Sequence, residues 1–302
     1  MEDRDQAKNR SWLVPAGVAA FYGGLVAATF AFADPSRAPR CLLWEEAAAG
    51  TEPAVSPGRG VALFEKYCSS CHGVSGDGRG PLAPFLSPPP RDFTRAIFKF
   101  RTNLDGNFPR DEDLFRSVSA GFPAHGMPVF DGFTSGDRWA LVAEVKRFAR
   151  SGFEARLAVE AKAGEIETSE VPAILEGAFR TGPPLEIPAA DDPGPGALRR
   201  GAEVYVRLQC ASCHGERGAG DGPSAADLRD EWGNPIRPAD FHNPLLAFKT
   251  GSRPRDIVRV LRTGIRGTPM PAVVLGEKLD WADLWCVAEF VREFPNGGNG
   301  KP

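Results

Sequence analysis

The residues best suited to chemistry lie in two pentapeptides of the type Cys-x-x-Cys-His. The two copies are Cys68-Ser69-Ser70-Cys71-His72 and Cys210-Ala211-Ser212-Cys213-His214. This pattern is the attachment signature of a c-type haem, in which two thiols bond to the porphyrin and the histidine binds the iron. Two intervening residues keep both sulfurs on one helical turn. The sequence therefore predicts two covalently bound haem c groups, each with an iron.

Zinc sites and thioredoxin-like redox pairs use the same cysteine spacing. A zinc site would require the two distant cysteine pairs to converge, and it would leave His72 and His214 unexplained. A thioredoxin-like pair is expected within a βαβ unit, whereas helix-like runs at residues 60–67 and 201–208 precede these motifs. Haem attachment is the better interpretation.

A sixth iron ligand is suggested by the scarcity of methionine. Besides Met1 the chain has only Met127 and Met270, which follow the two haem motifs at matching positions. A thioether is a soft, neutral ligand that raises the reduction potential of haem iron, and the flanking prolines would stiffen the loop around it. We expect the axial pairs His72/Met127 and His214/Met270, the alternative being two methionines that fill gaps in a core.

The remaining histidines and cysteines have no obvious role in the metal sites. His125 lies close to Met127 and could replace it, but the repeat places a threonine at the equivalent position. We interpret His125 and His242 as surface or haem-edge residues. Cys41 is expected to be an exposed or disulfide-bonded thiol, and Cys286, in an apolar helical run, a buried core residue.

Each proximal imidazole needs an acceptor that fixes its tautomer. Pro81 and Pro223 follow the two histidines at equal spacing, so their backbone carbonyls are candidates, although a plain turn is an alternative for both prolines. The haem propionates also need donors. Candidates in the loops after the motifs are Arg91, Arg101, Arg237, Lys249 and Trp232.

The two haem motifs each begin a similar block of sequence. The matched segments are Gly76-Asp77-Gly78 with Gly220-Asp221-Gly222, Arg91-Asp92-Phe93 with Ala239-Asp240-Phe241, Phe98-Lys99 with Phe248-Lys249, Asp113-Leu114-Phe115-Arg116 with Asp256-Ile257-Val258-Arg259, and Gly126-Met127-Pro128 with Pro269-Met270-Pro271. The period is far longer than that of a solenoid repeat. It therefore indicates a duplicated globular domain.

The periodicity predicts an all-α protein. In each block a helix leads into the haem motif, and a Gly- and Pro-rich loop (residues 73–90 and 215–238) follows it. A short helix begins near Asp111 or Pro254, the methionine loop comes next, and an amphipathic helix (residues 135–149 and 279–294) closes the domain. A haem would supply apolar surface that a domain of about 100 residues otherwise lacks.

The N-terminus contains an uncharged apolar run at residues 12–33. At about 1.5 Å per residue such a helix spans the roughly 30 Å hydrocarbon core of a bilayer. Basic residues precede it, as on the cytoplasmic side of an anchor. We expect a transmembrane helix, with a cleaved secretory signal ending near Ala33 as the alternative. Both would export the rest of the chain.

The charge distribution separates the two blocks. The 302 residues carry a formal net charge of −3, and the acidity is concentrated in the Pro-rich residues 151–195, which we expect to form an extended linker. Neither haem block is basic enough to suggest nucleic-acid binding. The predicted organisation is a tail with its anchor (1–58), a first haem domain (59–150), the linker (151–195) and a second haem domain (196–302).

The motif, the glycine-rich loop, the methionine loop and the closing helix together resemble the class I cytochrome c family, over residues 59–150 and again over 196–294. The resemblance implies hexacoordinate His/Met haem iron, single-electron transfer and haem attachment on the periplasmic side of a bacterial inner membrane. It also implies redox partners, such as subunits of a respiratory or photosynthetic complex. The segment Arg91-Asp92-Phe93 is similar to segments of exported cytochromes that accompany membrane oxidoreductases.

Three functions remain open at this point. The first is a membrane-tethered dihaem electron carrier without enzymatic activity, because both axial positions would be filled. The second is a dihaem enzyme of the peroxidase type, which would need one iron with an open position. The third is a structural subunit whose anchor docks into a larger complex, which is compatible with the first.

Overall fold

The computed structural model describes residues 58–104, 108–190 and 194–294. Within these ranges the regular structure is helical, with isolated β-bridges in place of strands, so the all-α prediction is confirmed for this part of the chain. The predicted membrane helix at residues 12–33 lies outside the described residues. Among the helices that are described, none combines the length and apolar character that a membrane span requires.

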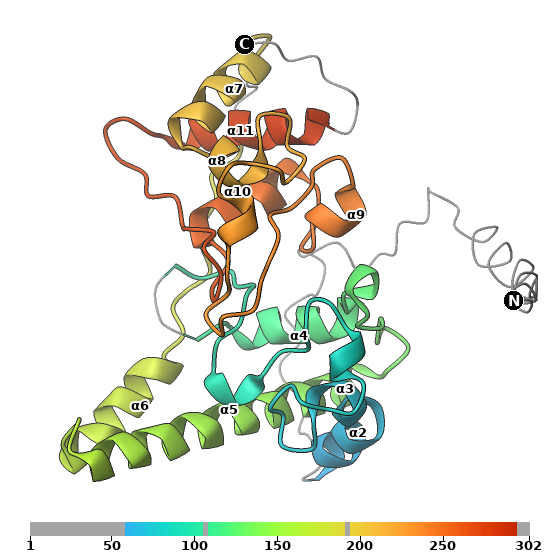
Figure 1. The fold of residues 1–302 in the computed structure, drawn as a ribbon, viewed down its shortest axis with the longest axis vertical. Coiled ribbons are helices and arrows are strands. Elements are labelled where there is room, and N and C mark those ends of the chain that lie inside the picture. The colour runs from blue at the N-terminus through green and yellow to red at the C-terminus, as the bar shows by residue number, and fades with distance from the viewer. Residues whose placement is uncertain (1–57, 105–107, 191–193, 295–302) are drawn as a thin grey trace, which may run out of the picture. The chain divides into compact units, whose positions relative to one another are not determined.

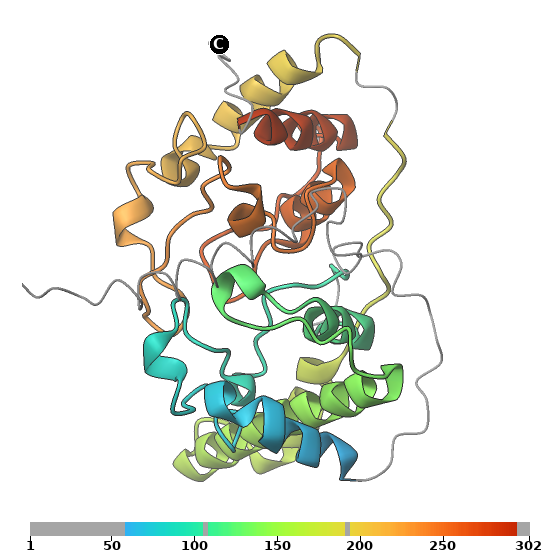
Figure 2. The same ribbon diagram turned by 90° about the vertical axis from the view of Figure 1, so that its right-hand side faces the viewer.

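Each haem block supplies its own set of helices (Figures 1 and 2). The first contains α2 (Arg59–Tyr67), α3 (Ser69–His72), α4 (Asp111–Ala120) and α5 (Ser135–Ala163). The second contains α7 (Ala197–Arg207), α8 (Ala211–His214), α9 (Pro244–Ala247), α10 (Pro254–Thr263) and α11 (Trp281–Glu293). The duplicated pattern in the sequence therefore corresponds to a duplicated order of helices.

In both blocks the helix before the haem motif crosses the closing helix at a glycine. A Cβ atom on Gly60 of α2 would overlap the backbone carbonyl of Ala140 in α5, and one on Gly201 of α7 would overlap that of Cys286 in α11. Only glycine permits such a close approach of two helix backbones. Figure 1 shows α7 lying against α11 at this crossing.

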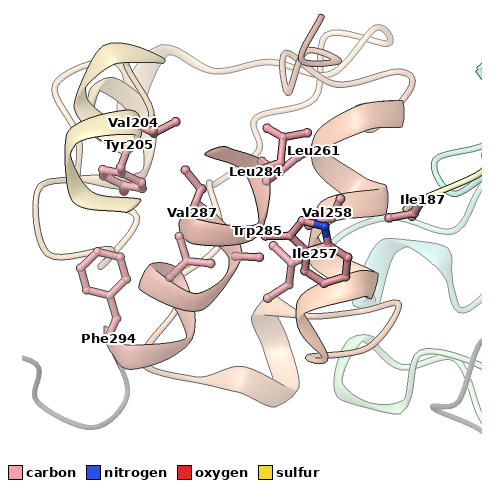
Figure 3. Packing of buried hydrophobic residues seen from close by; sticks show 12 residues of the cluster. Ile187, Val204, Tyr205, Ile257, Val258, Leu261, Leu284, Trp285, Val287 and Phe294 are labelled. Atoms are coloured by element: carbon pink, nitrogen blue, oxygen red, sulfur yellow. The ribbon is translucent and has the colours of Figure 1, made fainter. Parts of the chain in front are cut away.

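Apolar residues of the closing helices form the centres of the cores. In the second block Leu284, Val287 and Val291 of α11 pack with Val204 of α7 and Val258 of α10 in one buried cluster (Figure 3). In the first block α5 divides its buried side chains between two clusters. One contains Phe64 and Leu141, and the other contains Phe115 and Trp139.

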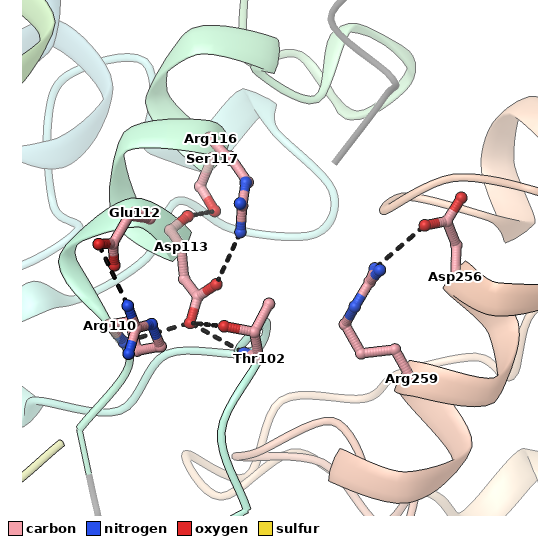
Figure 4. Close-up of polar contacts among 8 residues, drawn as sticks. All are labelled: Thr102, Arg110, Glu112, Asp113, Arg116, Ser117, Asp256 and Arg259. Atoms are coloured by element: carbon pink, nitrogen blue, oxygen red, sulfur yellow. Dashed lines mark hydrogen bonds and ion pairs between the residues drawn. The ribbon is translucent and has the colours of Figure 1, made fainter. Parts of the chain in front are cut away.

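A buried aspartate secures the start of the short helix in each block. Asp113 is fully buried, and its carboxylate accepts hydrogen bonds from the backbone N–H of Thr102 (2.8 Å) and of Arg110 (3.2 Å). Burial outweighs these bonds and raises the pKa of Asp113. Its repeat counterpart Asp256, also fully buried, accepts from the Arg259 guanidinium at 3.1 Å. Figure 4 shows both carboxylates with their partners.

Residues 151–195 differ from the extended linker that we expect from their composition. α5 continues beyond the predicted end at residue 149 to Ala163, where Gly164 caps it at φ 76°, and α6 (Val171–Phe179) follows. The segment 151–163 lacks proline and is rich in good helix formers, and its Leu157 is buried. The prolines lie later in the segment, so the average composition concealed the helix. The three boundaries between the four predicted segments stay predictions.

Candidate haem sites

The two haem motifs occupy short helices of the same geometry. α3 and α8 each complete one turn, in which the backbone N–H of His72 donates to the carbonyl of Cys68 (2.8 Å) and that of His214 donates to Cys210 (2.9 Å). All four motif cysteines are free and half-buried. The sequence prediction that both thiols of a pair lie on one turn is thus confirmed at each site.

Burial controls the protonation of these groups. It raises the pKa of Cys68 and of Cys210 to about 11, so both thiols are protonated at neutral pH. It also lowers the pKa of His72 and of His214, which keeps both imidazoles neutral. A neutral imidazole has a lone pair with which to bind iron.

A backbone carbonyl orients each imidazole, but it is not the carbonyl expected from the sequence. His72 Nδ1 donates to the carbonyl of Arg91 at 3.0 Å, and His214 Nδ1 donates to that of Ala239 at 3.2 Å. The predicted acceptors, Pro81 and Pro223, were wrong. Equal spacing after the histidine identified turn prolines, whereas the acceptors come from the end of the loop as it folds back. With Nδ1 engaged, Nε2 carries the lone pair.

Phenylalanine rings stack behind both imidazoles and were missed at the sequence level. The His72 ring lies on Phe93 with centroids 4.6 Å apart, and Phe93 stacks on Phe98 at 6.1 Å. In the second block the series is His214, Phe241 and Phe248, with separations of 4.8 and 5.7 Å. The repeated Asp-Phe and Phe-Lys pairs in the sequence were the available signal.

The loop after each motif folds by the same hydrogen bonds. The N–H groups of Gly78 and Gly220 donate to the carbonyls of His72 and His214 at 2.8 and 2.9 Å. These bonds make Gly78 and Gly220 equivalent, so the sequence pairing of residues 76–78 with 220–222 was wrong by two residues. The pairing was based on the shared Gly-Asp-Gly sequence, but the aspartate lies at a different distance along the chain from the histidine in each block.

The two methionines lie in loops of matching form. Phe122 and Met127 exchange backbone hydrogen bonds in an isolated bridge, and the N–H of Ile265 donates to the carbonyl of Met270 at 3.1 Å. Each loop folds back over the glycine that ends the preceding helix, at φ 56° for Gly121. Both methionines are half-buried. Their ligation of iron, like that of His72 and His214, stays a prediction.

The other predicted residues are two cysteines and two histidines outside the haem motifs. Cys286 is buried at 2% exposure, which confirms it as a core residue, whereas Cys41 lies outside the described residues. His242 is exposed and contacts Asp240 at 2.8 Å. His125 is half-buried, and its Nε2 has no hydrogen-bond partner among the described residues.

Both sites fit a covalently attached haem. Each offers two free thiols on one turn and a neutral imidazole with Nε2 available. In the second block Cys210 and Met270 both pack against the apolar cluster around α11, so apolar side chains adjoin this site. The indole N–H groups of Trp232 and Trp285, both from the second block, are buried without a partner in the described chain, so this block retains two donors for an additional polar group.

Known proteins resemble both blocks. Residues 198–294 match the family model described as Cytochrome c, and residues 56–143 match that of Cytochrome C oxidase, cbb3-type, subunit III. A solved chain of a reducing HAO-like protein complex from Kuenenia stuttgartiensis is 31% identical, with a TM-score of 0.65 over 80% of this chain and 96% of that chain. No curated protein sequence matches significantly.

These likenesses agree with the duplicated geometry. The 31% identity extends over nearly the whole of the solved chain and therefore includes both blocks. Two cytochrome c domains imply two covalently bound haem c groups, each with an iron. The chain accordingly belongs to the cytochrome c family, as a tandem protein with two cytochrome c domains.

Proposed function

We propose that this protein is a dihaem electron carrier, anchored in a membrane by residues 12–33, that passes single electrons between redox partners. Its cytochrome c domains imply electron transfer. The observation that carries the proposal of a carrier rather than an enzyme is the equivalence of the two sites, down to the methionine loops. A catalytic haem would be expected to differ from its partner at the sixth position.

In the proposed carrier, residues of this chain keep the ligands of each haem iron unchanged during electron transfer. Haem iron supplies a reversible one-electron couple when it is bound. His72 and His214 stay neutral and oriented because Nδ1 donates to a backbone carbonyl, and we assign Met127 and Met270 as the opposite ligands. One electron leaves the donor protein and one is gained by the acceptor protein, and no covalent bond is made or broken.

The partner is proposed to be a larger redox protein in a respiratory or photosynthetic assembly. The solved relative belongs to a reducing HAO-like protein complex, and the likeness to it spans both domains. The match to a subunit of cbb3-type oxidase is confined to residues 56–143. We therefore favour a complex with an HAO-like subunit over an oxidase, since only the first likeness extends into both domains.

The location is proposed from the sequence. An uncleaved helix at residues 12–33 would hold the haem domains on the periplasmic side of the bacterial inner membrane. A soluble periplasmic protein, released by cleavage near Ala33, is the alternative. The N-terminal sequence of the mature protein distinguishes the two, because cleavage would remove the anchor.

Visible spectroscopy of the natively matured protein tests the proposed function. Two low-spin haems per chain, both with the weak long-wavelength sulfur-to-iron band and both titrating as one-electron centres, are the expected result. A high-spin haem in either domain, together with turnover of peroxide, would contradict the carrier and favour a dihaem enzyme. Zinc in place of haem, or no added tetrapyrrole mass, would contradict every form of the proposal.

A further inference from the structure

A group of cations lies where the two cytochrome c domains meet. Residues 43–302 form one compact unit, and within it the Arg91 guanidinium of the first domain lies 4.3 Å from the centre of the Trp232 ring of the second. Lys99 of the first domain lies in the electrostatic field of Lys249 from the second. Three positive side chains from two domains are thus gathered in one place.

The two lysines are connected to the two haem sites in the same way. Lys99 directly follows Phe98, the last ring of the stack that begins at His72. Lys249 directly follows Phe248, which ends the stack that begins at His214. Arg91 is closer still, because its backbone carbonyl holds the His72 ring.

Equivalent positions of the repeat face each other at this contact. Lys99 lies in the electrostatic field of Lys249, and Arg116 of α4 lies in that of its counterpart Arg259 in α10. Such pairing is the mark of an approximate two-fold relation, in which a residue near the axis meets its own equivalent. A cation at such a position therefore meets a second cation.

Arg116 and Arg259 are neutralised within the protein, but Lys99 and Lys249 are not. Arg116 pairs with Asp113 at 3.4 Å and Arg259 pairs with Asp256 at 3.1 Å. Neither Lys99 nor Lys249 forms an ion pair or a side-chain hydrogen bond with any residue in the described part of the chain. Burial, with the charges of Arg91 and Lys249, lowers the pKa of Lys99 to about 8, and the Asp230 carboxylate opposes this shift without forming an ion pair with Lys99.

Half-buried cations that lack a carboxylate partner favour an anionic ligand. Trp232 adds a buried indole N–H that has no partner within the described residues. The carboxylates that a dihaem cytochrome brings to its own interior are the haem propionates. We propose that Arg91, Lys99 and Lys249 form one carboxylate-binding cluster that receives propionates of both haem groups and thereby couples their reduction potentials. The proposal rests on the proposed function, because it concerns the two carrier haems.

The test is a spectroelectrochemical titration of the natively matured protein and of its Lys99→Gln and Lys249→Gln variants. A positive charge favours ferrous over ferric haem, and its loss leaves a propionate unneutralised. We therefore expect both potentials to fall in each variant. The exposed residues Lys162 and Lys278 provide matched controls, and their substitution by Gln should leave both potentials unchanged. Lys99→Arg, which keeps the charge, should stay close to the unmodified protein.

Two results would overturn the shared cluster. One is a shift confined to a single haem in each variant, which would assign each lysine to its own domain. The other is no shift in either potential. Both can occur while the two haems still titrate as low-spin one-electron centres, in which case the carrier function stands. Loss or high-spin character of a haem in the unmodified protein would instead refute the carrier function. Haem content and the Lys99→Arg variant identify any failure of maturation.

Discussion

The two cytochrome c domains are alike where they hold haem and differ where they pack. Both orient the proximal imidazole on a backbone carbonyl, stack two phenylalanines behind it and cross their terminal helices at a glycine. The closing helix has 29 residues in the first domain and 13 in the second. Covalent attachment of a rigid planar group allows little variation around the motif, whereas the outer packing is free to change.

The helix crossings are also secured differently. In the first domain one ion pair, Arg59 with Asp137 at 2.7 Å, joins α2 to α5. In the second domain Asp283 accepts from Arg200 at 2.7 Å and from Arg207 at 2.9 Å, and it also forms a capping box at the start of α11. The shorter closing helix is therefore attached by more polar contacts.

The third difference concerns the residue whose carbonyl holds the imidazole. Arg91 performs this role in the first domain and has a side chain that reaches Trp232, whereas Ala239 performs it in the second and has almost no side chain. Both residues perform the same backbone function, but only Arg91 has a side chain that contacts the other domain. Four experiments test how far the two domains are alike and how far they are independent.

The largest effect is expected from His214→Ala. Loss of the proximal ligand should remove the second haem or its low-spin state, while the first domain keeps its haem because its attachment geometry is complete in itself. Haem stoichiometry by mass spectrometry and the visible spectrum measure this. Loss of haem from the first domain as well would show that the two domains do not mature independently.

A large effect on stability is expected at the helix crossings. In Gly201→Val the new side chain would overlap the Cys286 carbonyl and crowd Phe290, whose Cβ lies 2.7 Å from the added Cβ. We expect a loss of about 3 kcal/mol or more, measured by thermal unfolding. Gly60→Val should cost less because its second contact, Glu144, is 3.3 Å away.

Gly276→Val and Gly132→Val are the matched controls, because an added Cβ meets nothing within 4 Å at either position. Both should be close to neutral. Equal losses of stability at the crossings and at these control positions would show that the close approach of the helices does not depend on the glycines.

Met127→Ala should act on one iron. Removing the thioether opens the sixth position, so the first haem should become high-spin and its potential should fall by much more than that of the second. A redox titration followed at the main visible haem bands measures both centres, and the long-wavelength sulfur-to-iron band should remain for the second haem only. Equal damage to the two haems would refute separate His/Met sites.

The smallest effect concerns Asp283. Burial would raise the pKa of this carboxyl, but the hydrogen bond from Arg200 and the charge of Arg207 outweigh it and hold the pKa below the ordinary value of 3.8. A depressed pKa stabilises the fold above that value, and this stabilisation is lost as pH falls through the folded pKa. Asp283→Asn should cost about 1 kcal/mol at neutral pH and almost nothing in strong acid.

Asp137→Asn is the matched variant in the first domain. The hydrogen bond from Arg59 lowers the pKa of Asp137 in the same direction, but only one arginine contributes and the pair is exposed. Its pH dependence should have the same sign and a smaller size. Chemical denaturation at several pH values compares the two, and a larger effect at Asp137 would contradict the polar-contact argument.

Local pattern was sufficient for much of the fold. The haem turns, the short helices that begin at Asp111 and Pro254, and the buried position of Cys286 agree with expectation. Prediction failed where distant segments meet. The carbonyls of Arg91 and Ala239 reach the histidines only after the loop has folded back, and composition averaged over residues 151–195 concealed the continuation of α5.

The amino-acid sequence by itself determined the cofactor and the duplication, and it predicts the residues that bind the iron. These follow from covalent chemistry and from spacing within one helical turn, which need no information beyond a few neighbouring residues. Only the tertiary structure decided which carbonyl orients each imidazole, which rings lie behind it and which cations meet between the domains. Those contacts join residues far apart in the chain, and packing selects them rather than local conformation.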